Sequence, residues 1–576
     1  MQIGWIVGLA LAAMLTGMAA AEEIAPRPEQ TPATAGRSSV TARAFMVASA
    51  HPLASAAGHD VLAAGGSAAD AAVAVQVMLA LVEPQSSGLG GGGFLLYWNA
   101  ARGELTSFDA RERAPFAADP RYWLGEDGRP IDFRAAVIGG RSVGVPGTPL
   151  LLKTVHARYG RMPWATLIAP AIARAEAGFP ISPRLAAAIA KARDLDRFAA
   201  ARAYFFAADG SPKRAGAILR NPDLARTLRL FAAAGAAPFH TGAIARAIVA
   251  AVRTAVNPGI LTLEDLATYQ VIERRPVCIA YRGFEVCGMG PPSSGGLAVG
   301  QILGMLEAFD LAALGPGTQS RHLFLEASRL AFADRDLYMA DSDFVDMPQG
   351  LLDRDYLAAR ARLIDPKAAM GEAAAGAPPS GKTLPLSPDR PRPREGTTHF
   401  VIVDGHGDMV SATTTIEADF GSRVMTGGFL LNNELTDFSF EPETNGAPVA
   451  NRVEGGKRPR SSMAPTVVLQ GGAPVLLTGS PGGPNIIPYT AASIVAILDW
   501  KLGPQEAIDA PHVVNRNGAT IVEAGPAAAV TAAALAALGH ETVIEPLASG
   551  LHVIRIGPDG LSGAADKRRE GTVRGR

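Results

Sequence analysis

Strand-like and helix-like hydrophobic patterns alternate along the chain and predict a mixed protein with a large core. Residues 44–82 begin as a strand and continue as an alanine-rich run with apolar residues at helical spacing, which predicts one or two buried helices. The run FLLYW at 94–98 predicts a strand, and residues 104–115 predict a second strand that runs into a charged turn. Residues 150–256 are predicted to be mainly helical, with breaks at prolines and glycines.

The sharpest change of pattern comes just before Thr397. Residues 366–395 are rich in Pro, Ala, Gly and Arg, which predicts an exposed, flexible tether. Residues 397–416 carry β-branched and aromatic residues around a glycine-rich turn and predict a hairpin in a buried sheet. Two interpretations of Thr397 stay open. It is either a simple loop-to-strand junction or a point of chain cleavage, whose new α-amine (reference pKa about 7.7 to 8.0) would act as base for the threonine hydroxyl.

Composition narrows the function classes. The chain has 576 residues, 48% of them hydrophobic, and 53 basic residues balance 54 acidic ones. It therefore has no net field to attract nucleic acid, and none is expected as a partner. The glycine run at 90–93 leads into a strand rather than a helix, so we expect close backbone packing there and no phosphate site.

The N-terminus resembles an export signal. Residues 1–21 form an apolar run that ends in three alanines, short for a membrane span and without Lys or Arg at its start. We expect a signal peptide and a periplasmic or secreted protein with no membrane span after its removal; an uncleaved N-terminal anchor is the alternative.

Cys278 and Cys287 are the only cysteines. If Arg282 and Gly283 form a two-residue turn, the cysteines face one another across a hairpin at a separation compatible with a disulfide. A bridge and two reduced strand residues both remain open.

Eight motifs in a fixed order resemble the γ-glutamyltranspeptidase family over residues 44–568: EPQSSGLGGGGF, DARERAP, GVPG, PPSSGG, TTHF, LLNNELTDF, RPRSSMAPT and TGSPGG. The resemblance implies an α+β fold, a four-layer αββα sandwich of the N-terminal nucleophile hydrolase type formed jointly by two subunits of one precursor. The implied divisions are a signal peptide (1–21), a linker (22–43), a large-subunit core (44–365), a tether that ends at the cut (366–396) and a small-subunit core (397–576).

The resemblance also implies roles for individual residues. Cleavage falls between Gly396 and Thr397, Thr397 becomes the nucleophile, and Thr415 hydrogen-bonds to it. Gly482 and Gly483 supply backbone donors to the oxyanion. The remaining residues bind the substrate: Arg111, Ser461 and Ser462 at its α-carboxylate, and Glu434 and Asp437 at its α-ammonium.

Glu417 departs from the family, where many members have an asparagine, and its carboxylate favours a donor that bears an amine. A second departure is the segment after Asp437, shorter than in some members, which predicts a reduced lid and a more open cleft.

The implied substrates are γ-glutamyl compounds such as glutathione, with water, amino acids or peptides as acceptors, and no metal or organic cofactor. The preferred donor, the ratio of hydrolysis to transfer and the oligomeric state are left open. Two alternatives remain: a cephalosporin (glutaryl) acylase of the same fold, and a catalytically silent protein that binds γ-glutamyl peptides.

Overall fold

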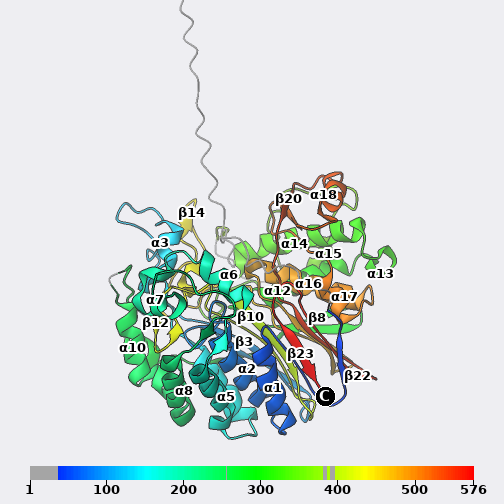
Figure 1. The fold of residues 1–576 in the computed structure, drawn as a ribbon. Coiled ribbons are helices and arrows are strands. Elements are labelled where there is room, and N and C mark those ends of the chain that lie inside the picture. Colours follow the sequence, from blue (N-terminus) through cyan, green and yellow to red (C-terminus); the bar gives the residue numbers. More distant parts are fainter. Residues whose placement is uncertain (1–36, 255, 380–385, 390–395) are drawn as a thin grey trace, which may run out of the picture.

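Two seven-stranded sheets pack face to face and carry helices on their outer sides (Figure 1). The computed structural model describes residues 37–254, 256–379, 386–389 and 396–576. In order across the first sheet lie β23 (Thr572–Gly575), β2 (Met46–Ser49), β10 (Thr397–Val403), β11 (Met409–Thr415), β3 (Gly92–Asn99), β4 (Glu104–Ala110) and β7 (Ile272–Arg274). Across the second lie β1 (Val40–Ala42), β22 (Gly560–Ala565), β21 (His552–Gly557), β17 (Ala473–Gly479), β16 (Thr466–Gln470), β9 (Phe284–Gly288) and β8 (Val277–Tyr281).

Three apolar clusters hold these layers together. Leu96 and Val401 of the first sheet meet Val467 and Ile554 of the second in the central cluster. The outer face of the first sheet packs against a cluster built largely from helices α1 (Pro52–Ala63), α2 (Ala68–Val82), α5 (Trp164–Ala177) and α8 (Pro222–Ala234). The second sheet is covered by α12 (Gly295–Leu306), α14 (Thr318–Tyr338) and α16 (Ile486–Leu498). The predicted four-layer αββα sandwich is confirmed, and each sheet mixes strands from before and after residue 397.

The hairpin predicted after the tether is the centre of the first sheet. β10 and β11 pair in antiparallel register, with Thr397 opposite Thr415, and all residues of both strands are buried. β-Branched residues suit strands that are covered on both faces.

The glycine run allows the close backbone approach that was predicted. A Cβ added at Gly91 would lie 1.9 Å from the carbonyl oxygen of Thr415, and one at Gly90 would lie 2.1 Å from that of Leu430. Only glycine fits at such distances. The glycine run therefore allows the start of β3 to lie directly against the end of β11.

The cysteine hairpin forms as expected. Cys278 on β8 lies opposite Cys287 on β9, and the two are joined in a disulfide. Arg282 and Gly283 form the turn between these strands with φ of 52° and 78°.

The predicted tether is described in part. Residues 386–389 contact the segment after Asp437: Ser387 donates its backbone N–H to the Pro448 carbonyl at 3.0 Å, and the buried Asp389 carboxylate accepts from Arg460 at 2.8 Å. The signal peptide predicted at 1–21 lies outside the described residues. Among those residues no single helix is long and apolar enough to cross a membrane, although one bent helix pair reaches that length and composition.

Candidate active site

Thr397 begins β10 at the edge of a cavity, with its hydroxyl beside the carbonyl that precedes it. The Thr415 hydroxyl donates to the Gly396 carbonyl oxygen at 2.7 Å, and the Thr397 hydroxyl donates to Thr415 Oγ1 at 3.3 Å. The strand register produces this contact, because Thr397 and Thr415 are paired across the hairpin. A hydroxyl that polarises the carbonyl next to the predicted threonine nucleophile suits an attack on the Gly396–Thr397 bond.

The cavity gathers most of the predicted site residues. It holds about 490 Å³ of space including its open mouth. Its lining consists of Arg111, Arg335, Thr397, Thr415, Glu417, Glu434, Asp437, Arg460, Ser461, Ser462, Met463, Gly483, Pro484 and Ile486. Two predicted site residues are not in the lining, and each directly precedes one that is: Gly396 before Thr397 and Gly482 before Gly483.

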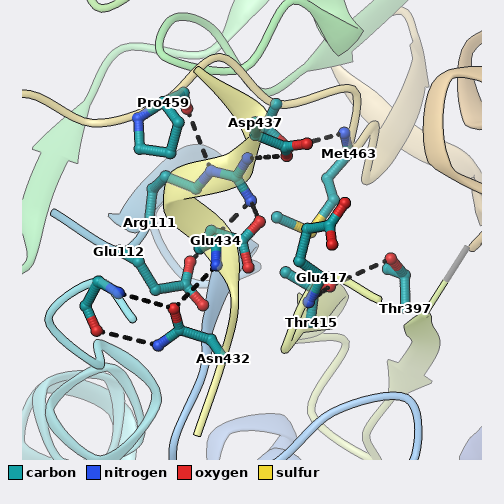
Figure 2. Close-up of polar contacts among 12 residues, drawn as sticks. Arg111, Glu112, Thr397, Thr415, Glu417, Asn432, Glu434, Asp437, Pro459 and Met463 are labelled. Atoms are coloured by element: carbon teal, nitrogen blue, oxygen red, sulfur yellow. Dashed lines mark hydrogen bonds and ion pairs between the residues drawn. The ribbon is translucent and has the colours of Figure 1, made fainter. Parts of the chain in front are cut away.

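Arg111 follows the last residue of β4 and is held from two sides (Figure 2). Its guanidinium donates to Glu434, to Asp437 at 2.5 Å, and to the backbone carbonyls of Pro459 and Arg460 at 3.1 Å. Burial alone would lower the pKa of Arg111, but Glu434, Asp437 and Glu112 together raise it above its usual value. The side chain therefore stays a fixed cation, 1% exposed, within a group of acids.

The acids outnumber that cation. Burial raises the pKa of Glu112 to about 7 against the lowering effect of Arg111, and burial also raises the pKa of Glu434 above its usual range. Within the described part of the chain, neither oxygen of Glu112 has a hydrogen-bond partner, nor does Oε2 of Glu434. The cluster thus has carboxyl groups to spare for an additional cation.

Asn432 positions the two predicted ammonium ligands by joining three motifs. Its side-chain amide donates to the carbonyls of Gly90 at 2.8 Å and Gly144 at 3.0 Å. Its oxygen accepts from the backbone N–H groups of Gly144 at 2.9 Å and Glu434 at 3.0 Å. The last contact fixes the start of the short 3-10 helix η4 (Glu434–Asp437), which presents both carboxylates to the cavity.

Glu417 lies between Arg111 and Thr397 in the cavity wall (Figure 2). Its backbone has φ of 75°, a conformation uncommon outside glycine, and its N–H donates to Thr415 Oγ1 at 2.8 Å. The Asn433 amide donates to its carboxylate. The orientation of the Glu417 side chain is therefore coupled, through its backbone, to the position of Thr415 and its partner Thr397.

Arg335 and Arg460 also line the cavity and were missed by the sequence analysis. Arg335 of α14 donates to the hydroxyls of Ser294 at 2.9 Å and Ser462 at 2.8 Å. Ser294 in turn donates to the Ser461 carbonyl at 2.7 Å. The serine-rich turn in PPSSGG was the sequence signal for these contacts. Through Ser294 it holds Arg335 and the Ser461 backbone in place, and so it supports the second serine pair rather than the substrate.

The predicted oxyanion donors lie where a sheet strand turns into a helix. Gly482 and Gly483 have φ of 135° and 56°, values that glycine adopts without strain. Gly482 precedes η5 (Gly483–Asn485) and Gly483 begins it; α16 follows, and its N-terminal residue Ile486 lines the cavity. The N-terminal end of a helix favours negative charge, which suits a developing oxyanion.

Within the residues that the structure describes, two other clusters carry metal-ligand atoms. Cys278 and Cys287 lie near Glu285 but are bonded to each other. His322, Glu326 and His540 are buried together, with the His322 and His540 rings hydrogen-bonded at 2.8 Å and Glu326 accepting from Arg329 and the Met370 N–H. Hydrogen bonds already occupy these donor atoms. His399, two residues after Thr397, is buried, and its Nδ1 bonds to the Thr413 hydroxyl.

Comparison with known proteins places the chain among related enzymes. The family described as Gamma-glutamyltranspeptidase matches residues 54–575. The "Glutathione hydrolase proenzyme" of Bacillus subtilis (strain 168) is 36% identical over 542 residues, which cover 92% of this chain and 91% of that protein. The "Acylase ACY 1 proenzyme" of Pseudomonas sp. (strain V22) is 37% identical and covers 94% of each chain. Among solved structures, a cephalosporin acylase from Bacillus halodurans superimposes with a TM-score of 0.83 at 28% identity, over 95% of this chain and 99% of that one.

Proposed function

The chain belongs to the gamma-glutamyltranspeptidase family, and from this premise we propose that it is a proenzyme that cuts itself between Gly396 and Thr397. The mature enzyme hydrolyses glutathione and related γ-glutamyl amides, and it transfers the γ-glutamyl group to amines. The large and small subunits stay associated, because both sheets combine strands from each.

Self-cleavage begins with the Thr397 hydroxyl, which attacks the Gly396 carbonyl while Thr415 hydrogen-bonds to that oxygen. The Gly396–Thr397 C–N bond then breaks as the hydroxyl proton passes to the departing nitrogen, which leaves Gly396 as an ester on Thr397 Oγ1. Water hydrolyses this ester to a Gly396 carboxylate and frees both the hydroxyl and the α-amine of Thr397. The freed α-amine then takes the hydroxyl proton as Thr397 Oγ1 bonds to the γ-carbonyl carbon of the donor. The Gly482 and Gly483 N–H groups stabilise the oxyanion, and the amine returns its proton to the departing amino group. Water or an acceptor amine releases the γ-glutamyl ester.

One observation carries the choice of substrate: Glu417, Glu434 and Asp437 line the same cavity as Arg111, with Glu112 buried behind. A γ-glutamyl donor brings an α-carboxylate for the guanidinium and an α-ammonium for the surplus carboxylates. The serine pair, Ser461 and Ser462, completes the carboxylate end. A donor without the ammonium would leave these acids buried beside its own negative charge.

The acylase relatives supply a second candidate function. The likeness to a cephalosporin acylase and to an "Acylase ACY 1 proenzyme" favours turnover of glutaryl amides, which lack the α-ammonium. The carboxylate surplus favours the γ-glutamyl function over this one.

Export completes the proposal. The apolar, alanine-ending stretch at 1–21 supports cleavage of a signal peptide and a periplasmic or secreted enzyme.

The test compares release of nitroaniline from L-γ-glutamyl and glutaryl p-nitroanilide by the purified protein, with Thr397→Ala as blank. We expect a higher kcat/KM for the γ-glutamyl compound and no activity in the blank. A preference for the glutaryl compound would assign the protein to the acylases. Equal release by the protein and its blank would rule out Thr397 as the nucleophile.

A further inference from the structure

Beneath the predicted nucleophile lies a buried arginine that the reaction scheme above does not use. Arg569 belongs to the turn before β23, is 1% exposed, and donates from Nη1 to the carbonyl oxygen of Thr397 at 2.9 Å. Its Nε has no hydrogen-bond partner among the described residues. Burying a charged guanidinium costs free energy, so its contact with a single backbone carbonyl suggests a specific role.

The end of a neighbouring strand explains how the contact arises. β2 pairs with β10 only as far as Ser49 opposite Phe400, so Thr397 extends beyond the last residue pair on that side. Arg569 supplies a donor to the Thr397 carbonyl where the sheet offers none. Its side chain is confined there, because a Cβ on Gly550 would lie 2.7 Å from its Cδ.

We propose that Arg569 is a positioning residue for the mature N-terminal threonine: it fixes the Thr397 backbone and its charge keeps the new α-amine in the unprotonated form that acts as base. The inference rests on the proposed function, since the amine exists only after cleavage at Gly396–Thr397.

The distances make the charge effect large. The α-amine nitrogen is two covalent bonds from the carbonyl carbon whose oxygen accepts from Arg569, which puts the guanidinium about 5 to 6 Å from the amine. A unit charge at that distance shifts a pKa by about two units at an effective dielectric constant of about 20. A cation disfavours the ammonium form, so the amine of the wild-type enzyme is free at a lower pH.

Other charged groups face the same site and partly oppose this effect. Glu83 accepts from the Thr398 hydroxyl at 2.8 Å and from Arg184, which also donates its backbone N–H to Glu570 at 3.0 Å. The remaining groups are Asp419 and His552, which interact electrostatically with Arg569, and Glu417 in the cavity wall. Loss of Arg569 would make the charge around the amine more negative, because the acids of this group would remain. That change also raises the pKa of the amine.

The test is the pH dependence of kcat/KM for L-γ-glutamyl p-nitroanilide, whose acid limb reports the base of the free enzyme. Arg569→Met and Arg569→Lys are compared with the wild type, and Arg574→Met on the exposed end of β23 is the matched control. In Arg569→Met we expect the acid limb to move up by about one to two pH units. Activity should then fall at least about ten-fold at pH 6.5 and approach that of the wild type at pH 9. Arg569→Lys should move the limb less, and Arg574→Met should not move it.

Two outcomes would overturn the proposal: an unchanged limb in Arg569→Met, or an equal loss at every pH, which marks a structural role only. If Arg569→Met remains uncut, Arg569→Gln replaces it, since glutamine keeps a donor but not the charge, and the same limb shift is expected. If the proposed function itself is wrong, the result is different: the Thr397→Ala variant keeps the activity of the wild type.

Discussion

Among single residues, the hydroxyl and carboxylate groups around Thr397 decide both self-cleavage and the choice of substrate. The identities of Thr397, Thr415, Arg111, Glu434 and Asp437 could be predicted because they stand in short motifs. Their contacts could not, because the pairing of Arg111 with two acids depends on where η4 meets the end of β4.

Thr415→Val should slow self-cleavage. The substitution removes the hydroxyl that donates to the Gly396 carbonyl but keeps the shape of the side chain. Loss of one such donor costs about 100-fold or more in rate. Conversion of precursor to two chains on denaturing gels measures the rate. Thr414→Val is the control, because Thr414 lies on the same strand and the substitution removes its buried hydrogen bond to Gln76. Equally slow cleavage in both variants would show that Thr415 has only a structural role.

Glu417→Asn should shift preference away from the ammonium. Asparagine tolerates the positive φ of this position, so we expect the variant to fold. Loss of the charged acceptor should lower the ratio of γ-glutamyl to glutaryl turnover about ten-fold. The two p-nitroanilides measure that ratio, with the exposed Glu441→Asn as control. An unchanged ratio would show that Glu417 does not contact the substrate amine.

At the scale of elements, the chain's local patterns predicted most helices and strands near the site. The β-branched residues predicted the hairpin of β10 and β11. The position of the glycine run before a strand predicted the close backbone packing found there. The contacts of Arg335, Arg460 and Arg569 were not predictable, because each side chain joins segments more than a hundred residues apart.

Gly91→Ala tests the close approach at the end of β11. The added Cβ would lie 1.9 Å from the Thr415 carbonyl oxygen, so β3 or β11 must move. We expect a loss of about 1 to 3 kcal/mol in the free energy of unfolding and slower self-cleavage. Gly88→Ala, in the same loop with nothing within 4 Å of its added Cβ, should change neither. Urea unfolding in the Thr397→Ala background measures the effect on a single chain; equal stability of the two variants would contradict the packing argument.

At the scale of the whole molecule, segments on both sides of residue 397 build one core, so cleavage need not separate them. The sandwich was predictable only through family resemblance, since alternating helices and strands alone do not specify which strands share a sheet. Burial across that core also lowers the pKa of several histidines.

His512 should make the fold sensitive to acid. Burial, assisted by Arg568 and Lys567 and opposed by Glu523 and Asp566, lowers its pKa to about 4, against an ordinary value of about 6.5. The folded state therefore favours the neutral ring, and stability is lost as pH falls from about 6.5 to about 4. In the Thr397→Ala background, His512→Gln should remove an acid-dependent loss of about 3 kcal/mol. The exposed His406→Gln should not; parallel pH curves for wild-type His512 and His512→Gln would contradict the assignment.

Intact mass spectrometry of the protein, denatured during turnover of a γ-glutamyl donor, shows in one measurement whether the chain is cut at Thr397 and which part carries the γ-glutamyl group. The account predicts two chains, the smaller being residues 397–576, with one γ-glutamyl group on the smaller chain and none on the larger. Thr397→Ala should give a single uncut chain without the group. A wild type that turns over substrate as one uncut chain, or carries the γ-glutamyl group on the larger chain, would contradict the account.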